Sequence, residues 1–367
     1  MTTSRISLTG PDSHTLVREP GVGIVIIGPA LPGSRRPDLV VSATDTIDWS
    51  VFDPFTVPAG YPWPRVFRYE GDDKGFLTWA TRRPIETFTW QPHAALTADA
   101  SAAQLSRLSV ILRDGPLNLV LPADSHYFSA AGDLSLLTVT APGDCPPLGF
   151  FPDTQPTGPP VVLPALPGLV DARSVDVAVP PLRQPFDCAS LLQFPGLTRV
   201  ALSGSLTNLP ALASLRHLEV LEFRYCPDLA DLPPLDTWTL SHLLLFNTDE
   251  TTGKRLRAAA GVPSMSISQL RKPSWFRTEY GLPFSAWTPR KAKAATKAYR
   301  TAASAIGKAT TSADAEEAVR AFVRAINALP DVETTEREDA GEAVALLTTG
   351  TPYAQAAETW FDDERDF

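Results

Sequence analysis

A short apolar phrase repeats three times in the middle of this 367-residue chain. It reads Leu197-x-x-Val200-x-Leu202, then Leu218-x-x-Leu221-x-Phe223, then Leu240-x-x-Leu243-x-Leu245, so the repeats start 21 and then 22 residues apart. A unit of this length contributes one short strand whose apolar side chains cannot be buried alone, and neighbouring units therefore have to stack. The spacing predicts an elongated stack of strands that presents a binding surface.

The central repeat carries more than spacing. Residues 218–226 fit the pattern Leu-x-x-Leu-x-Leu-x-x-Asn/Cys, with Phe223 at the third apolar position and Cys226 at the turn out of the strand, and Leu229 follows three residues later. Ser205 and Thr248 take that place in the flanking repeats, where we expect their hydroxyls to bond turn backbone. The chain thus resembles bacterial leucine-rich-repeat proteins, strongly over 197–248 and weakly over about 80–270. This resemblance implies an α/β solenoid with short parallel strands on its concave side and irregular or 3₁₀ segments on its convex side.

Weaker copies of the phrase extend the expected solenoid to residues 76–275. They are Ile85-x-x-Phe88-x-Trp90, Leu105-x-x-Leu108-x-Val110, Leu134-x-x-Leu137-x-Val139 and Ala172-x-x-Val175-x-Val177. Between Pro146 and Pro167 the chain carries eight prolines. That stretch is either a stiff interdomain linker or an irregular excursion within one continuous solenoid.

The two ends of the chain follow different patterns. Residues 1–75 predict an irregular β-rich region, with apolar stretches at 22–27, 39–41 and 66–69. Residues 289–367 have helical periodicity and predict an α-helical domain that caps the last strand. Its helices are expected at 291–306, at 315–329 before Pro330, after a capping box at Thr335-x-x-Glu338, and after Thr351 with Pro352 at the first helical position.

Composition limits the possible partners. The formal net charge is −9, which argues against a general binder of nucleic acid or of anionic membranes. The start of the chain lacks the apolar region of a signal peptide, and the run from Ile24 to Ile27 is far too short to span a bilayer, so we expect a cytoplasmic protein. Cys145, Cys188 and Cys226 form neither a disulfide framework nor a C-x-x-C metal site. We expect them to be buried, and we expect no cofactor.

One segment is concentrated in basic residues, from Arg290 to Arg300. A contact with nucleic acid or membrane is one interpretation. The other is a solvated helix face that pairs with the acidic tail at 362–366.

Strand geometry selects the candidate site. In each repeat the first, fourth and sixth residues point inward, so the third, fifth and seventh point outward onto the concave face. That face mixes charge with exposed apolar and aromatic side chains, as protein-recognition surfaces do. The alternative is that the C-terminal helices cover Leu244 and Phe246. The candidate partner-binding residues are Arg199, Ser203, Glu222, Arg224, His242, Leu244 and Phe246.

We therefore expect a non-catalytic module that binds another protein. One alternative is an enzyme with a site in the N-terminal β region or where the solenoid meets the helical cap, which a deep pocket containing His93 or His126 with a carboxylate within hydrogen-bond reach would favour. The two Asp-Ser-His runs, at 12–14 and 124–126, are interpreted as turns, because adjacent residues do not converge into a catalytic triad. Another alternative is a toxin-neutralising or regulatory protein.

Overall fold

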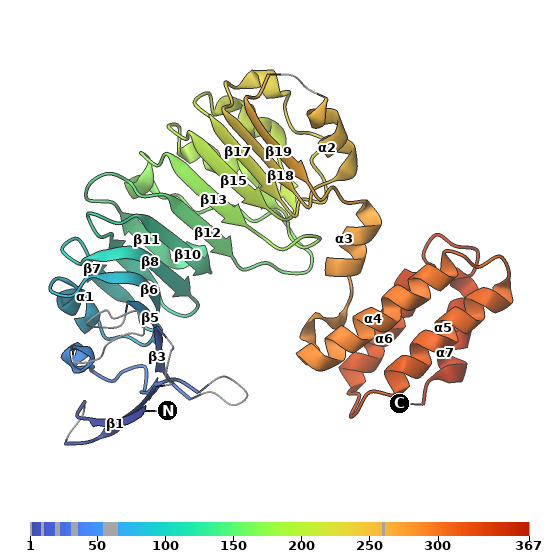
Figure 1. Ribbon diagram of the computed structural model, residues 1–367, viewed down its shortest axis with the longest axis horizontal. Helices are drawn as coiled ribbons and strands as arrows, with labels where there is room; N and C mark the ends of the chain where they lie inside the picture. The colour runs from blue at the N-terminus through green and yellow to red at the C-terminus, as the bar shows by residue number, and fades with distance from the viewer. Residues whose placement is uncertain are drawn as a thin grey trace. The chain divides into compact units, whose positions relative to one another are not determined.

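The computed structural model describes residues 2–8, 11–18, 23–30, 36–53, 65–258 and 261–366. The chain forms two compact units, Met1–Arg271 and Lys272–Phe367. The first is built around strands and the second is built from helices (Figure 1). The first 75 residues are thus in the same unit as the repeats. Val22, part of one expected apolar stretch, lies outside the described residues.

One long sheet organises the first unit. Its described strands are, in order across the sheet, β1 (Thr2–Ile6), β2 (His14–Arg18), β4 (Leu39–Val40), β3 (Ile24–Gly28), β5 (Val66–Glu70), β6 (Ile85–Gln91), β8 (Leu105–Leu112), β10 (Tyr127–Gly132), β12 (Leu148–Pro152), β13 (Ser174–Ala178), β15 (Arg199–Ser203), β17 (Val220–Arg224), β18 (His242–Phe246) and β19 (Ser264–Ser268). The neighbouring pairs from β4–β3 to β18–β19 are all parallel, and the strands lie side by side in Figure 1. The protein is therefore a mixed α/β protein with a long parallel sheet.

Short segments return the chain between strands. Three strands form a second parallel sheet, β7 (Leu96–Asp99), β9 (Leu117–Val120) and β11 (Leu137–Thr140), and β14 (Phe186–Asp187) pairs with β16 (Leu206–Thr207). The 3₁₀ helices are η1 (Trp49–Phe52), η2 (Leu134–Leu136), η3 (Pro167–Leu169), η4 (Cys188–Gln193), η5 (Leu209–Ser214) and η6 (Leu235–Thr237). The described α-helices of this unit are α1 (Gly75–Ala80) and α2 (Glu250–Arg257). Frequent proline suits such short connections, because it interrupts long helices and central strands.

The repeated phrase occupies equivalent positions in neighbouring strands. Val200, Leu221 and Leu243 lie opposite one another across β15, β17 and β18, and all three are fully buried. Leu202, Phe223 and Leu245 form the next buried row. Because side chains alternate between the two faces of a strand, each inward row leaves an outward row beside it. The phrase therefore predicted both the strands and their shared inner face.

Consecutive strands also end in the same backbone conformation. The residue directly after each of the last four strands has a positive φ: Gly204 (95°), Tyr225 (54°), Asn247 (52°) and Gln269 (55°). A Cβ atom on Gly204 would lie 1.7 Å from the carbonyl oxygen of Val179, so only glycine fits there. The chain thus leaves each of these strands by the same left-handed turn.

The polar residues at the turn position of the repeat differ in whether their side chains form hydrogen bonds. The hydroxyl of Ser205 accepts a hydrogen bond from the backbone of Leu182 at 2.8 Å, as expected. The thiol of Cys226 faces the carbonyl of Arg224 at 3.3 Å. Thr248 is fully buried, and its Oγ1 has no hydrogen-bond partner among the described residues, so the expectation for Thr248 was wrong.

Three of the four weaker phrases mark strands of the long sheet, namely β6, β8 and β13. The phrase that begins at Leu134 was misassigned, because it forms η2 and β11 of the short sheet. Leu134, Leu137 and Val139 are buried in the same core, and the sequence pattern alone does not distinguish which sheet supplies them. The proline-rich stretch contains β12, which pairs with β10 and β13, so the linker interpretation was wrong.

Aromatic side chains fill the core beside β5 and β6. Trp49 contacts Phe67, Tyr69 and Phe76 with ring centroids 5.2–6.2 Å apart. Its indole N–H donates to Asp73 at 2.6 Å, and that of Trp79 donates to Asp53 at 2.9 Å. These bonds allow the indoles to be buried without leaving a donor unsatisfied.

The second unit has a hydrophobic core of its own, which includes Phe322, Val323 and Ile326. Its helices are α3 (Pro273–Tyr280), α4 (Pro289–Ile306), α5 (Ser312–Asn327), α6 (Thr334–Thr348) and α7 (Ala354–Glu364), with a 3₁₀ turn η7 (Phe284–Ala286). Within the part of the chain that the structure describes, no helix has the length and apolar character needed to cross a membrane.

Two helix starts differ from the expected ones. The capping box of α6 joins Glu333 to Glu336, not Thr335 to Glu338, because the helix begins two residues earlier than that motif requires. Helix α7 begins at Ala354, so Pro352 is not at its first position. Both motifs occur in the sequence, but a carboxylate two residues upstream caps α6 instead.

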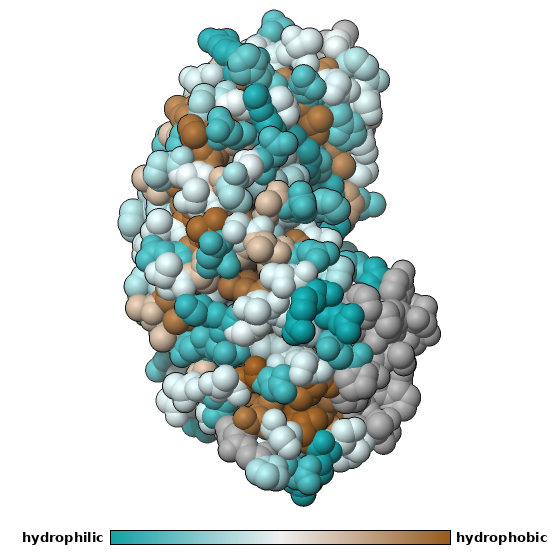
Figure 2. Space-filling model, turned by 90° about the vertical axis from the view of Figure 1, so that its left-hand side faces the viewer, coloured by the Kyte–Doolittle hydropathy of each residue, from teal (hydrophilic) through white to brown (hydrophobic). Residues whose placement is uncertain are grey.

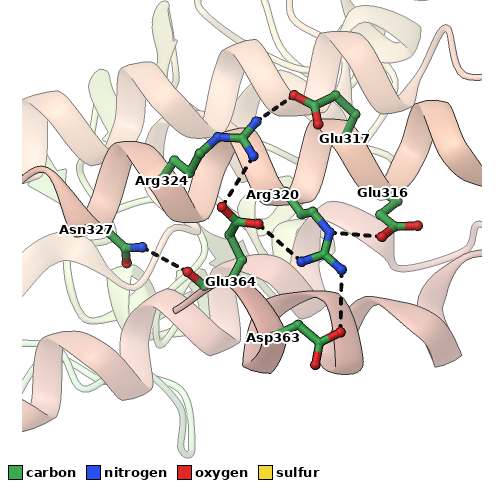
Figure 3. A network of polar contacts seen from close by, with 7 residues as sticks. All are labelled: Glu316, Glu317, Arg320, Arg324, Asn327, Asp363 and Glu364. Carbon is green, nitrogen blue, oxygen red and sulfur yellow. Dashed lines mark hydrogen bonds and ion pairs between the residues drawn. The ribbon is translucent and has the colours of Figure 1, made fainter. Parts of the chain in front are cut away.

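The acidic tail pairs with α5 (Figure 3). Glu364 lies 3.1 Å from a guanidinium nitrogen of Arg320 and 3.3 Å from one of Arg324. Arg320 also contacts Asp363 at 3.4 Å, and Asn327 donates to the Glu364 carbonyl at 2.9 Å. The expected pairing of this tail with the basic segment at 290–300 was therefore wrong, and the network instead joins α7 to α5.

Candidate functional site

The candidate residues gather on one surface, which we call the open face. It is the side of the long sheet opposite its core, and it is formed by the outward residues of β15, β17 and β18. The register places these residues in three rows, Arg199–Val220–His242, Ala201–Glu222–Leu244 and Ser203–Arg224–Phe246. All seven candidates thus lie within three adjacent strands, because the same phrase repeats at the same register.

A chain of ion pairs crosses this surface. Arg199 pairs with Asp176 of β13 on one side and with Glu222 on the other, where the nitrogen–oxygen distance is 3.0 Å. Arg224 contacts the second oxygen of Glu222 at 2.9 Å. Asp176 was missed among the candidates, although it occupies the fifth position of the phrase that begins at Ala172.

The ion pairs shift the pKa values of Glu222 and Arg199. Burial by itself would raise the pKa of Glu222, but hydrogen bonds and the positive charges of Arg224 and Arg199 lower it below its usual value. Burial would likewise lower the pKa of Arg199, yet Asp176 and Glu222 raise it. Both groups are therefore charged at neutral pH. The Glu222 side chain is only 12% exposed, so its carboxylate holds the two arginines in place.

Arg224 is the exposed end of this chain. Its side chain is 46% exposed, and the described residues pair it with a single carboxylate. A guanidinium has five N–H donors in a planar fork, so Arg224 retains donors that can bind a carboxylate of another molecule.

Apolar side chains lie directly beside Arg224. Leu244 and Phe246 are half-buried and, among the described residues, belong to neither hydrophobic core. The ring of Phe246 meets that of Tyr225 edge-on at 5.7 Å. Tyr225 was not a candidate because it lies outside the alternating positions, but an aromatic residue just before Cys226 was a usable signal. A non-glycine residue in the left-handed region costs about 1–2 kcal/mol, which makes an aromatic side chain there notable.

The last strand borders the open face with hydroxyl groups. His242 of β18 lies 2.9 Å from Oγ of Ser264, ring nitrogen to hydroxyl. Ser264, Ser266 and Ser268 of β19 are all exposed. The apolar pair is thus flanked by ion pairs on one side and by serines on the other, an arrangement typical of binding surfaces with an apolar centre and a polar rim.

The open face continues upstream with small residues and one tyrosine. A Cβ atom on Gly149 would lie 2.1 Å from the hydroxyl of Tyr127, so the ring of Tyr127 needs glycine beside it. Burial raises the pKa of Tyr127, and the negative charge of Asp176 raises it further. The hydroxyl of Tyr127 is therefore neutral at physiological pH and is available for hydrogen bonding.

A cavity of about 400 Å³ lies at the other end of the sheet. Its lining includes Arg68, Glu70, Thr89, Gln91 and Ile111. His93 contacts Glu70 at 3.2 Å and Asp114 at 2.8 Å but does not line the cavity. The hydrogen bond that His93 donates to Asp114 raises the pKa of His93 despite partial burial. The described lining residues thus do not combine a nucleophile with this histidine.

The Asp-Ser-His runs have local roles. Oγ of Ser13 lies 2.8 Å from Nδ1 of His14, so two of these adjacent side chains contact each other. Nε2 of His14 lies 3.8 Å from a carboxylate oxygen of Asp45, which is too long for a hydrogen bond. Ser13 also accepts a bond from the backbone of Leu8 at 3.0 Å, which closes the β1–β2 hairpin.

The described part of the chain shows no metal-binding cluster and no reactive thiol. No three His, Cys, Asp or Glu side chains converge there as metal ligands. Cys188 and Cys226 are fully buried, as expected, whereas Cys145 is only partly buried. Burial raises the pKa of the Cys188 thiol to about 12, which leaves it protonated and unreactive at neutral pH.

Another side of the molecule is shown in Figure 2. Along most of it, small groups of apolar residues alternate with polar ones, and a larger apolar area lies near the lower end. Exposed apolar residues such as Val162 and Leu182 come from connections between strands.

Comparison with known proteins does not assign the chain to a family. No protein-family model matches the chain, and neither a curated protein nor a solved structure matches it. The functional argument therefore depends on the geometry of the open face.

Proposed function

We propose that this chain is a non-catalytic cytoplasmic protein that binds another protein through the open face of the long sheet. One observation supports this proposal: Arg224 lies beside the Tyr225–Phe246 pair. The other charged residues of the ion-pair chain already pair with one another. Arginine and aromatic residues contribute most of the binding energy in many protein interfaces.

We further propose that the first unit is a leucine-rich-repeat solenoid. Support comes from the repeat spacing, from the equivalent register of β15, β17 and β18, and from the positive φ after successive strands. In such a fold each repeat buries its apolar row against its neighbours and leaves its outward row to bind ligands. The candidate residues occupy that outward row.

The test compares two open-face variants with two matched controls. Arg224→Ala and Phe246→Ala remove the exposed guanidinium and the apolar anchor. The controls are Arg216→Ala and Val162→Ala, which remove an exposed arginine and an exposed apolar side chain elsewhere in the first unit. The tagged full-length protein is used to recover partners from a lysate of the native host, followed by mass spectrometry. The affinity of each variant for the recovered partner is then measured.

Each open-face variant is expected to weaken binding by about 2 kcal/mol, which corresponds to about 30-fold in Kd. The controls are expected to bind within about two-fold of the parent, and all four variants to keep its melting temperature within about 2 °C, because the altered side chains lie outside the core. Equal recovery of the partner by Arg224→Ala, Phe246→Ala and the parent protein would refute this assignment.

A further inference from the structure

The second unit separates its charges along the sequence. Residues 272–310 contain eight Lys and Arg residues and one acidic residue, whereas 311–366 contain four basic and fourteen acidic residues. The net charge of −9 for the whole chain conceals this separation. Local charge, not the total, determines whether a surface attracts an anion.

The basic residues of α4 form a stripe. Arg290, Lys293, Lys297 and Arg300 are spaced by three, four and three residues, which places them on one face of the helix, and all four are exposed. At 1.5 Å per residue the stripe is about 15 Å long. Helix α4 contains no acidic residue.

Described acidic residues leave most of this stripe unneutralised. Arg300 pairs with Glu279 at 2.6 Å, but no ion pair involving Arg290, Lys293 or Lys297 is present among the described residues. The acidic tail is already engaged by Arg320 and Arg324 on α5 (Figure 3). Lys291 has a different role, since its ammonium group binds Glu336 at 2.8 Å and is only 13% exposed.

Stability of the helix does not account for the stripe. Arg290 lies in the first turn of α4, where the helix dipole disfavours a positive charge by about 0.3–1 kcal/mol. The other exposed residues of α4 are small, among them Thr301, Ser304 and Ala305. The stripe therefore lacks the large apolar anchors that a membrane-surface helix or a protein hot spot uses.

We propose that α4 binds the phosphate backbone of nucleic acid without sequence preference. Each strand of duplex DNA carries one phosphate per 3.4 Å or so of axis, so a 15 Å stripe passes roughly four phosphates. The small residues between the cations allow the helix to approach the backbone closely. This binding is independent of the open face, so either proposal can fail without the other.

The experiment measures fluorescence anisotropy of a labelled 20-base-pair duplex titrated with the full-length protein. Four neutralised phosphates predict a salt slope of about −3.6, which corresponds to about a 150-fold loss of affinity between 50 and 200 mM NaCl. The double variant Lys293→Glu/Lys297→Glu is expected to lose at least about ten-fold in affinity at 50 mM NaCl and to show a slope about half as steep.

The matched control is Arg82→Glu/Arg216→Glu, which changes the net charge equally at exposed positions of the first unit. It is expected to bind the duplex within about three-fold of the parent, and circular dichroism should show that both double variants are folded. Absence of binding at 50 mM NaCl, or an equal loss in both double variants, overturns the proposal. So does displacement of the duplex by poly-glutamate or anionic vesicles at lower charge concentration than by unlabelled duplex, because the preferred occupant is then an acidic protein or a membrane.

Discussion

The strand unit and the helical unit bury their apolar residues in different ways. In the strand unit each buried row is completed by the rows of the neighbouring strands, and the opposite side of the sheet remains available as the open face. In the helical unit α4, α5, α6 and α7 enclose one core from several sides. A repeated strand therefore produces a continuous surface row, whereas a helical bundle places its polar residues on separate helix faces.

The largest expected effects come from removing one buried aromatic ring in each unit. Phe223 and Phe322 are at most 1% exposed, and replacing either with alanine should cost about 3–5 kcal/mol. Because the two cores are separate clusters, Phe223→Ala should lower the unfolding temperature of the strand unit alone, and Phe322→Ala that of the helical unit alone. Calorimetry combined with hydrogen exchange assigns each transition, and a joint shift of both transitions would contradict this separation.

A smaller effect is expected from two buried carboxylates. Burial opposes ionisation of Glu336, but Lys291 and the backbone of Glu333 lower its pKa below the usual value. The stabilisation from Glu336 is therefore present above about pH 4.5 and is lost as the pH falls through the lower, folded-state pKa. Glu336→Gln should destabilise the helical unit by about 1.5–3 kcal/mol at pH 7 and reduce its sensitivity to acid.

Glu222→Gln is the counterpart in the strand unit. Its cost should be smaller, about 0.5–1.5 kcal/mol, because Arg199 keeps its pairing with Asp176. Unfolding of both variants between pH 3 and pH 7 tests the comparison. A larger loss from Glu222→Gln would mean that the ion-pair chain stabilises the fold more than the helical pair does.

The smallest effect concerns His93 in the strand unit. The hydrogen bond that His93 donates to Asp114 raises the pKa of His93 despite partial burial, so the charged form of His93 stabilises the folded state. That contribution is complete below about pH 6.5 and disappears as the pH rises through the higher, folded-state pKa. The pair is partly exposed, and we expect less than about 1 kcal/mol. His93→Gln should remove the difference in stability of the strand unit between pH 6 and pH 8, while leaving the helical unit unchanged.

Periodicity carried most of the information that was available before the structure. The three repeats predicted β15, β17 and β18 and their inward rows, because a two-residue alternation has only one arrangement that buries every leucine. The helical periodicity similarly indicated the long helices α4 and α5. Local motifs were less reliable, since Glu333 caps α6 in place of the Thr335 motif.

Two contacts at the open face were not predicted, although the sequence contains a signal for each residue. Asp176 joins the ion-pair chain only because β13 lies next to β15, across a connection that contains β14 and η4. Tyr225 reaches Phe246 only because the chain leaves β17 in the left-handed conformation. Contacts of this kind depend on register and on backbone dihedrals, which a short apolar pattern does not specify.

The sequence by itself determined that short strands repeat, which of their side chains are buried, and where the strands give way to helices. Burial of apolar side chains follows residue spacing, and spacing is directly visible in the sequence. Only the tertiary structure decided which charges meet. It paired the acidic tail with α5 and left the stripe of α4 exposed, because electrostatic contacts depend on distances between segments far apart in the chain.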